Sequence, residues 1–235
     1  MILSIDDDRL RSCSGRGVIV AVLDSGIHAT HPHVGGIDGG ISFAPPDAAD
    51  DLTDRIGHGT AVGAAIREKS PDVRLLAVKI FDRRLTTNAE LLAQSIEWAA
   101  DQGTSIINLS VGTTNAAHVE RLASAVARAH AAGAIVVSAR AANGVDCWPG
   151  ALPEVVGVIA DVDVDRQTCH VAPSGNDAVV LRASPFPRPI PNVPPERNLS
   201  GVSFAVANVS GILARLVEAC GGDAMAARRA LAMRE

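Results

Sequence analysis

The segment Val18-Ile19-Val20-Ala21-Val22-Leu23-Asp24-Ser25-Gly26 predicts the class of fold. Its first six residues are continuously apolar and mostly β-branched, a pattern typical of a strand that is buried on both faces of a sheet. Asp24 and a glycine follow at once, which places a carboxylate at the carboxyl end of that strand. Because ligands bind at this end of parallel sheets, the segment predicts a central strand with a candidate functional group at its tip.

Similar apolar runs recur along the chain and alternate with segments of helical spacing. Residues 90–100 carry apolar side chains every three or four positions, and Thr87 and Glu90 are spaced as a capping box. Residues 119–131 predict a second helix of this kind, which Gly133 ends. The further buried strands that we expect are residues 75–80, 105–109, 134–137 and 155–159.

This alternation predicts an α/β fold of three layers, in which helices flank both faces of a mostly parallel, twisted β-sheet. Parallel neighbours require crossover connections, and the predicted helices supply them. The chain of 235 residues contains no internal repeat and no domain boundary, so we expect one domain over residues 1–235.

Residues 183–198 differ in character from the rest of the chain. They contain six prolines, which exclude a helix or a central strand, so we expect a stiff surface loop that leads directly to Ser203. Residues 201–220 then predict a helix. Its apolar positions are Val206, Val209, Leu213 and Val217.

The composition restricts the partners of the protein. With 26 acidic and 21 basic residues the net charge is −5, which argues against a surface for nucleic acid or anionic membrane. No stretch approaches the roughly 18 apolar residues that span a bilayer. Aromatic residues make up only 3% of the chain and none is tyrosine, so the core must consist of aliphatic side chains.

The amino terminus and the cysteines predict a cytoplasmic location. Residues 1–8 have neither the basic nor the apolar region of a secretory signal. The four cysteines form no Cys-x-x-Cys pair, so we expect reduced thiols rather than a disulfide framework or a zinc site. They are Cys13, Cys147, Cys169 and Cys220. We expect no cofactor.

Two short stretches carry polar residues that complement Asp24. Gly57-His58-Gly59-Thr60 places a histidine at the start of a helix, and Gly201-Val202-Ser203-Phe204-Ala205 does the same for a serine. A serine hydroxyl is a weak nucleophile that needs a base within hydrogen-bond reach, and the base needs an acid to fix its tautomer. Asp24, His58 and Ser203 provide these three groups in a known chain order. The alternative, and the commoner role for any one of them alone, is that each caps a turn or a helix.

The residues around these positions resemble the signature motifs of subtilisin-like serine peptidases. The motifs are Asp24-Ser25-Gly26, His58-Gly59-Thr60 and Gly201-x-Ser203-Phe204-Ala205, and the resemblance runs over residues 17–216. It implies a serine endopeptidase that hydrolyses peptide bonds through an acyl-enzyme on Ser203. It also implies that Ser110-Val111-Gly112 is an edge that pairs with an extended peptide or protein substrate.

Around the serine, the sequence departs from the family pattern. In the family an asparagine side chain helps to bind the oxyanion, and counting from Gly133 places Ala142 at that position, with Asn143 next. Val202 replaces the usual threonine, and Ala205-Val206-Ala207-Asn208 lacks the usual proline. Loss of one oxyanion donor costs roughly a hundred- to a thousand-fold in rate. Asn143 supplies the donor if the turn is one residue shorter than in relatives; otherwise backbone N–H groups serve alone.

Two segments that relatives usually carry are expected to be missing. Residues 67–72 lead directly to Leu75, where relatives have a calcium-binding insertion, so we expect no tightly bound metal there. Only 16 residues precede Gly17, so we expect the domain to fold without a propeptide.

Three other clusters have competing interpretations. The pattern His28-x-x-His31-x-His33 would suit zinc, but histidines in loops are more often solvated. The pattern Asp161-x-Asp163-x-Asp165 could bind a cation, but a solvated acidic face is the preferred interpretation. Arg83-Arg84 lies where the resemblance places the substrate cleft and would favour acidic residues in the substrate, although exposed arginines need no function.

Two alternative functions fit the same residues. A maturation protease or peptide ligase would form the same acyl-enzyme, but the acyl group would be divided differently between water and an amine. A peptide-binding pseudoprotease would be catalytically weak or inactive. Ala142 and Val202 favour the pseudoprotease, whereas the complete set of Asp24, His58 and Ser203 argues against it.

Overall fold

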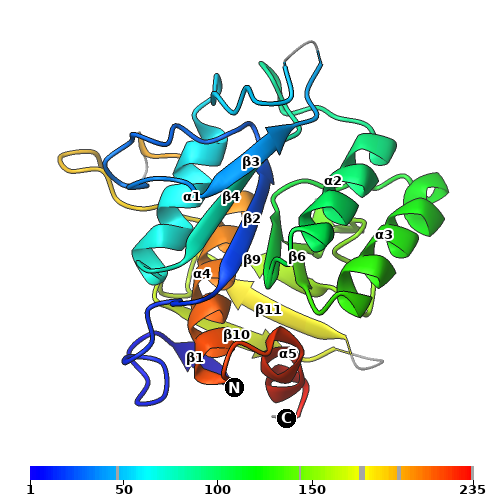
Figure 1. Ribbon diagram of the computed structural model, residues 1–235. Helices are drawn as coiled ribbons and strands as arrows, with labels where there is room; N and C mark the ends of the chain where they lie inside the picture. The colour runs from blue at the N-terminus through cyan, green and yellow to red at the C-terminus, as the bar shows by residue number, and fades with distance from the viewer. Residues whose placement is uncertain (46–47, 143, 175–177, 195–196, 234–235) are drawn as a thin grey trace.

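The computed structural model of the chain describes residues 1–45, 48–142, 144–174, 178–194 and 197–233. The strands of its large sheet are β1 (Ile2–Ser4), β2 (Ile19–Asp24), β3 (Gly39–Ser42), β4 (Arg74–Lys79), β5 (Ile106–Leu109), β6 (Ile135–Ala139), β9 (Val156–Ala160), β10 (Thr168–Ala172) and β11 (Val179–Ala183). Within the described residues their order is β1-β10-β11-β9-β6-β5-β2-β4-β3 (Figure 1). Neighbours from β11 to β3 pair in parallel, whereas β10 and β1 add antiparallel strands at one edge.

Helices cover both faces of this sheet. The helices are α1 (His58–Lys69), α2 (Ala89–Asp101), α3 (Val119–Ala131), α4 (Val202–Ala219) and α5 (Ala224–Ala232). One buried cluster joins α1, α4 and α5 to the sheet, and a second joins α2 and α3 to the opposite face. Along β2, Val20 and Val22 belong to the first cluster, whereas Ala21 and Leu23 belong to the second. Both faces of β2 are therefore buried, as its continuous apolar sequence requires, and the predicted three-layer α/β fold is confirmed.

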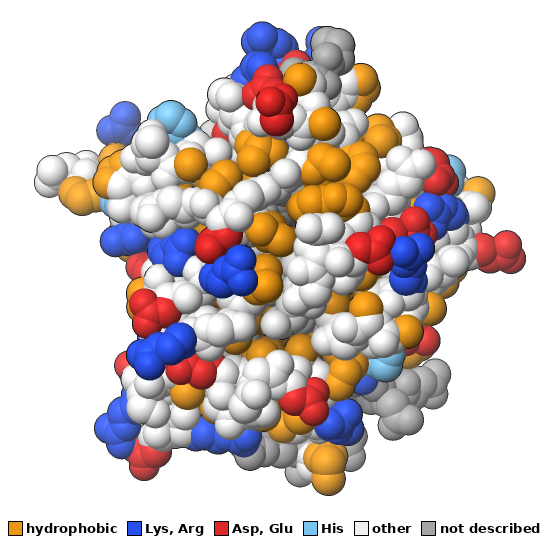
Figure 2. Space-filling model, in the orientation of Figure 1, with side chains coloured by type: hydrophobic (Ala, Val, Ile, Leu, Met, Phe, Trp, Pro, Cys, Tyr) orange, Lys and Arg blue, Asp and Glu red, His pale blue; other side chains and the backbone are white. Residues whose placement is uncertain are grey.

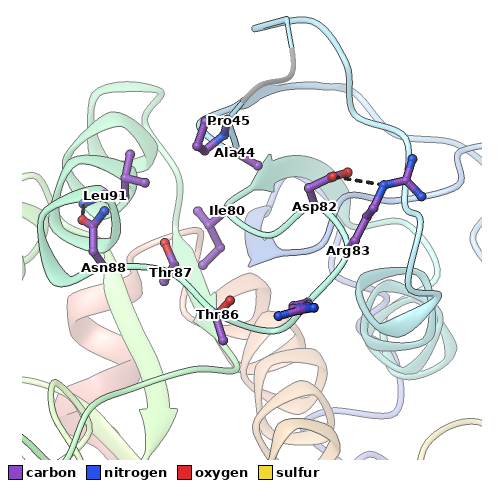
Figure 3. Close-up of a pocket in the computed structure, with 10 residues that line it drawn as sticks. Ala44, Pro45, Ile80, Asp82, Arg83, Thr86, Thr87, Asn88 and Leu91 are labelled. Carbon is purple, nitrogen blue, oxygen red and sulfur yellow. Dashed lines mark hydrogen bonds and ion pairs between the residues drawn. The ribbon is translucent and has the colours of Figure 1, made fainter.

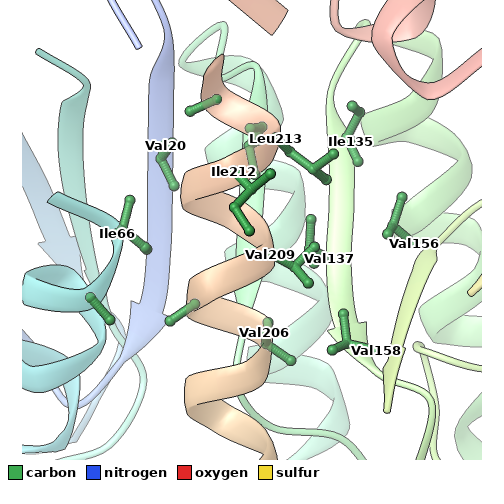
Figure 4. Close-up of a cluster of buried hydrophobic side chains, with 14 of the residues drawn as sticks. Val20, Ile66, Ile135, Val137, Val156, Val158, Val206, Val209, Ile212 and Leu213 are labelled. Carbon is green, nitrogen blue, oxygen red and sulfur yellow. The ribbon is translucent and has the colours of Figure 1, made fainter. Parts of the chain in front are cut away.

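Helix α4 forms the centre of the first cluster. Figure 4 shows it lying along the sheet, with Val206 and Val209 directed toward Val137 and Val158 of the central strands. Ile66 of α1 lies on its other side. A helix enclosed in this way is apolar over most of its circumference, because little of it meets water.

The expectation that no stretch of the chain is long and apolar enough to span a bilayer was wrong. Val202–Ala219 is an 18-residue helix with a mean hydropathy of 1.4, so by length and composition alone it could cross a membrane. However, 72% of it is buried inside the protein, against the sheet and α1. The apolar stretch that the sequence analysis overlooked therefore belongs to the core.

The predicted elements agree with the structure to within one or two residues, but one cap was assigned wrongly. The α2 helix begins after Asn88, whose side chain accepts a hydrogen bond from the Leu91 N–H at 2.8 Å. Thr87 therefore does not form the expected capping box with Glu90. Asparagine is a strong N-cap, and Asn88 directly precedes the first helical residue.

Exposed charges of both signs are distributed over the surface. On the face shown in Figure 2, basic side chains lie next to acidic ones. Arg121, for example, binds Glu90 and Glu97 at 2.8 Å and 2.6 Å and so connects α3 to α2. Basic groups used in this way are not collected into one continuous patch on this face.

Candidate active site

Asp24 and His58 form a hydrogen-bonded pair, in which Asp24 is buried and His58 is partly buried. Asp24 is the last residue of β2 and is fully buried, while His58 is the first residue of α1. The Nδ1 atom of His58 lies 2.8 Å from Oδ1 of Asp24, which also accepts the Ser25 N–H at 2.8 Å. With its proton on Nδ1, the imidazole donates to the carboxylate and leaves Nε2 as a proton acceptor.

Gly59 permits this close approach of helix and strand. A Cβ atom at Gly59 would lie 2.2 Å from the carbonyl oxygen of Gly26 and 3.1 Å from the Cβ of Asp24. Any side chain there would push α1 away from β2 and lengthen the bond between His58 and Asp24. The Gly-His-Gly-Thr sequence therefore has a steric reason as well as a chemical one.

Ser203 is the second residue of α4, and among the described residues no hydrogen bond joins its hydroxyl to His58. The ring of Phe204, its neighbour, packs against the His58 ring with centroids 5.4 Å apart. Within the described part of the chain, the hydroxyl of Ser203 has one hydrogen-bond partner, the Ser110 carbonyl at 3.3 Å. Groups from β2, α1, α4 and the segment after β5 thus converge at the carboxyl end of the sheet.

The electrostatic surroundings favour a protonated His58. Burial disfavours the charged imidazole, but the hydrogen bond and negative charge of Asp24 outweigh it, and Asp54 adds to their effect. The pKa of His58 is therefore raised above its ordinary value. A raised pKa strengthens the imidazole as a base, because its protonated form is stabilised by the carboxylate.

Asp54 is a residue of this site that the sequence analysis missed. Its Oδ1 accepts the Gly57 N–H at 2.8 Å and the Ser25 hydroxyl at 2.8 Å, and its Oδ2 accepts the Thr60 N–H at 2.9 Å. Burial opposes the charge of Asp54, but the bonds from Thr60, Gly57 and Ser25 prevail and lower its pKa. The available signal was an aspartate just before the helix that starts at His58, where carboxylates satisfy free N–H groups.

The segment Ser110-Val111-Gly112 is held between α4 and residues 147–148. The buried side chain of Asn108 donates to the Ser110 hydroxyl at 3.2 Å and accepts from Ser210 of α4 at 3.0 Å. A Cβ atom at Gly112 would lie 2.5 Å from the Cys147 sulfur, so this segment packs closely on its neighbour. All three residues keep partial exposure, as a peptide-binding edge needs.

The region predicted to bind the oxyanion is described only in part. Ala142 is the end of the short strand β7 (Ala141–Ala142) and pairs antiparallel with Val145 of β8 (Val145–Asp146). Its methyl side chain offers no donor. Asn143 lies outside the described residues, so the prediction that it supplies the donor stays a prediction.

Asn208 directly follows Ala207, which stands where the family has its proline, and it fixes the adjoining loop. Its amide donates to the carbonyls of Ser184 and Phe186 at 3.0 Å and 3.1 Å. Gly201 N–H donates to the Pro185 carbonyl at 2.9 Å, which joins the two ends of the proline-rich loop at its base. The loop is thereby anchored to the helix that carries Ser203.

The other clusters from the sequence have local partners. The Nδ1 of His31 accepts the His33 N–H at 3.2 Å, and Asp161 accepts the Asp163 N–H at 3.1 Å. Across the described ranges, no three His, Cys, Asp or Glu side chains are arranged to hold a metal ion. All four cysteines are free, and burial raises the pKa of Cys169 to about 12, which keeps its thiol protonated.

Arg83 and Arg84 line a cavity of about 440 Å³ beyond the carboxyl end of β4 (Figure 3). Arg83 lies 3.5 Å from Asp82, and Figure 3 shows the two side chains directed toward each other. Asp82 therefore offsets part of the positive charge. The expectation that these arginines favour acidic residues in a substrate stays a prediction.

Comparisons with known proteins agree with this geometry. The Subtilase family matches residues 15–234. The chain is 33% identical over 217 residues to the thermostable alkaline protease of Halalkalibacterium halodurans, covering 87% of this chain and 58% of that protein. It is 31% identical over 221 residues to the intracellular serine protease of Paenibacillus polymyxa, covering 85% and 66%. Among solved structures, Sphericase is similar with a TM-score of 0.74 at 24% identity, covering 94% of this chain and 84% of that one. The chain thus spans less than two thirds of the length of these two sequence relatives.

Proposed function

The chain belongs to the subtilase family, and from this premise we propose that it is a serine endopeptidase that hydrolyses peptide bonds through an acyl-enzyme on Ser203. The observation that carries the proposal is the 2.8 Å bond between His58 and the buried Asp24, next to the helix that presents Ser203. We assign the whole chain to one peptidase domain.

Each residue has a defined part in the proposed reaction. His58 Nε2 takes the proton of Ser203 as the serine oxygen attacks the peptide carbonyl, and it returns that proton to the leaving amine. Asp24 holds the imidazole in the required tautomer and stabilises its charged form. Ser110-Val111-Gly112 pairs with the extended backbone of the substrate, which gives binding with little dependence on sequence.

We also propose that the protein acts in the cytoplasm on peptide or protein substrates. Four free cysteines support this location, because reduced thiols persist where disulfides do not form. The 31% identical relative from Paenibacillus polymyxa is named an intracellular serine protease, which supports it as well.

A fluorophosphonate probe with an intact-mass measurement tests the proposal. We expect one adduct per chain, located by peptide mapping on Ser203, because only an activated serine reacts at neutral pH. Incubation with a peptide should then give the products of hydrolysis. An inert serine would contradict the proposal, and product transferred to an added amine instead of water would identify a ligase.

The oxyanion region gives a second prediction. If Ala142 occupies the donor position, Ala142→Asn should raise kcat by roughly a hundred-fold with little change in KM, since the donor contacts the oxyanion only in the transition state. If Asn143 is the donor, Asn143→Ala should lower kcat by a similar factor and Ala142→Asn should do little. Steady-state kinetics on one peptide distinguishes the two. If neither substitution changes the rate, backbone N–H groups alone bind the oxyanion.

A further inference from the structure

A cavity of about 580 Å³ lies beside the candidate active site and takes no part in the reaction described above. It is lined by the start of α1 and the residues just before it, by histidines of residues 28–33, and by five described residues in or next to the proline-rich loop. In Figure 1 the loop, drawn in orange, extends beside the blue segment that follows β2. The described lining residues are His28, His31, His33, Thr53, Asp54, Gly57, Thr60, Ala61, Ala64, Pro187, Arg188, Ile190, Asn198 and Leu199.

The position of the cavity relates it to the leaving group of the reaction. Gly57 and Thr60 flank His58, which must protonate the leaving amine, and Leu199 closely precedes Ser203. None of the described lining residues belongs to the segment Ser110-Val111-Gly112. That segment contacts Ser203 separately, through the Ser110 carbonyl. A peptide that pairs with that edge on its acyl side would therefore continue past Ser203 toward this cavity.

Part of the cavity wall is apolar, and the loop on its outer side is tied by a hydrogen bond at its base. Ile190 and Leu199 are large apolar side chains that stay 47% and 51% exposed, although such residues are usually covered. Ala61 and Ala64, one helical turn apart on α1, leave the space opposite open. Because Gly201 N–H binds the Pro185 carbonyl at the base of the loop, the wall is anchored rather than free.

Among the described residues that line the cavity, the ionisable groups are one arginine, three histidines that become positive when protonated, and one aspartate. Arg188 has no carboxylate partner within the described residues, and its Nη1 lies 3.5 Å from the His33 carbonyl oxygen. Burial lowers the pKa of His33, Arg188 and His31 lower it further, and Glu68 raises it. The guanidinium of Arg188 is therefore close enough to His33 to disfavour its protonated form. Asp54, the one acid among the described lining residues, already accepts hydrogen bonds on both oxygens.

We propose that this cavity binds the leaving-group side of the substrate and selects a segment that carries a carboxylate next to an apolar residue. The carboxylate is either an acidic side chain or a free carboxyl terminus, since Arg188 recognises both through the same charge-assisted hydrogen bonds. The apolar neighbour contacts Ile190 and Leu199. This inference rests on the proposed peptidase function for the direction in which the substrate lies.

Binding to the Ser203→Ala protein tests the proposal without turnover. The probes are a two-by-two set of short peptides that have Glu or Gln after the scissile bond and end in a free acid or an amide. Calorimetry should show each carboxylate-bearing peptide binding roughly ten- to a hundred-fold more tightly than the Gln amide, the size of one hydrogen bond to a charged group. The Glu amide and the Gln acid identify which source of carboxylate is preferred.

The matched variants locate the effect at Arg188. Arg188→Met should remove the preference, Arg188→Lys should keep part of it, and Arg229→Met on α5 should keep all of it, because Arg229 is an equally charged, exposed arginine paired with Asp223 elsewhere on the surface. Equal binding of all four peptides, or a preference that survives Arg188→Met in a protein with an unchanged melting curve, would overturn the proposal. Probe labelling of Ser203 in the wild-type protein is read separately. A carboxylate preference without labelling therefore supports this cavity while rejecting peptide hydrolysis.

Discussion

Replacing Ser203 by alanine is expected to lower kcat for peptide hydrolysis by roughly a million-fold, the size known for loss of a serine nucleophile from a complete triad. In the proposed reaction His58 and Asp24 act through the serine, so without it only substrate binding and oxyanion stabilisation would remain. The same substitution should abolish labelling by a fluorophosphonate. Steady-state kinetics and intact mass measure the two effects.

The fold should survive this substitution. The Ser203 hydroxyl makes one hydrogen bond of 3.3 Å, to the Ser110 carbonyl, in a partly exposed position, so its loss is expected to cost at most about 1 kcal/mol in the free energy of unfolding. Ser200→Ala, an exposed serine just before α4, is the matched control and should retain full activity. Turnover that persists in Ser203→Ala, or that disappears equally in Ser200→Ala, would contradict the assignment of the nucleophile.

Asp24→Asn is expected to reduce kcat by about ten thousand-fold while leaving Ser203 in place. The amide of asparagine can donate to Nδ1 of His58, which stabilises the tautomer with its proton on Nε2, and that tautomer cannot accept the serine proton. The change is nearly isosteric, but Oδ1 of Asp24 accepts the Ser25 N–H as well, so an amide nitrogen in its place also removes that acceptor. Asp163→Asn, which removes one exposed carboxylate in the turn after β9, is the control and should not change the rate.

The pH dependence of the two proteins gives an independent measurement. The pKa of His58 is raised, and hydrolysis needs the neutral imidazole, so wild-type kcat/KM should fall as the pH falls through a value above about 6.5. Asp24→Asn removes the main cause of the raised pKa, so the acidic limb of its residual activity should move to lower pH. NMR titration of the His58 ring checks the same shift without turnover. A limb at the same pH in both proteins would mean that another group controls the profile.

The same shift affects stability with the opposite sign. A histidine whose pKa is raised on folding binds its proton more tightly in the folded state. Protonated His58 therefore contributes to stability fully below its unfolded pKa, about 6.5, and this contribution is lost as the pH rises through the folded value. Low pH thus favours the folded state through His58 while it removes the base that the reaction requires.

Much of the fold was predictable because its signals are local. Strands β2, β4, β5, β6 and β9 are short, continuous and apolar, and α2 and α3 carry apolar residues at helical spacing. The strands that the sequence analysis missed lie toward the edges of the sheet and have weaker patterns. β10 carries Thr168 and His170, which are only partly buried. β3 begins with Gly39-Gly40, which has no strand-like side chains at all.

In the candidate site, too, residues within local motifs were predictable and a residue whose partners lie in other segments was not. Asp24, His58 and Ser203 could be proposed from the sequence because short motifs with flanking glycines surround each of them. Asp54 was missed because its importance depends on partners in two other segments, Ser25 on one side and Thr60 on the other. The cap of α2 was assigned to Thr87 instead of Asn88 because the two adjacent residues are both common N-caps and only Thr87 has a glutamate three residues later.

The amino-acid sequence was sufficient to predict the α/β class and the central strands and helices along the chain, and to propose Asp24, His58 and Ser203 as the reactive residues. This was possible because periodicity, turn residues and motifs act over a few neighbours. Which distant segments meet became visible only in the three-dimensional structure. The approach of Gly59 to Gly26 and the cavity between His33 and Arg188 join residues that are far apart in the chain. Such contacts depend on how helices and loops pack against the finished sheet, and no local pattern of residues encodes that packing.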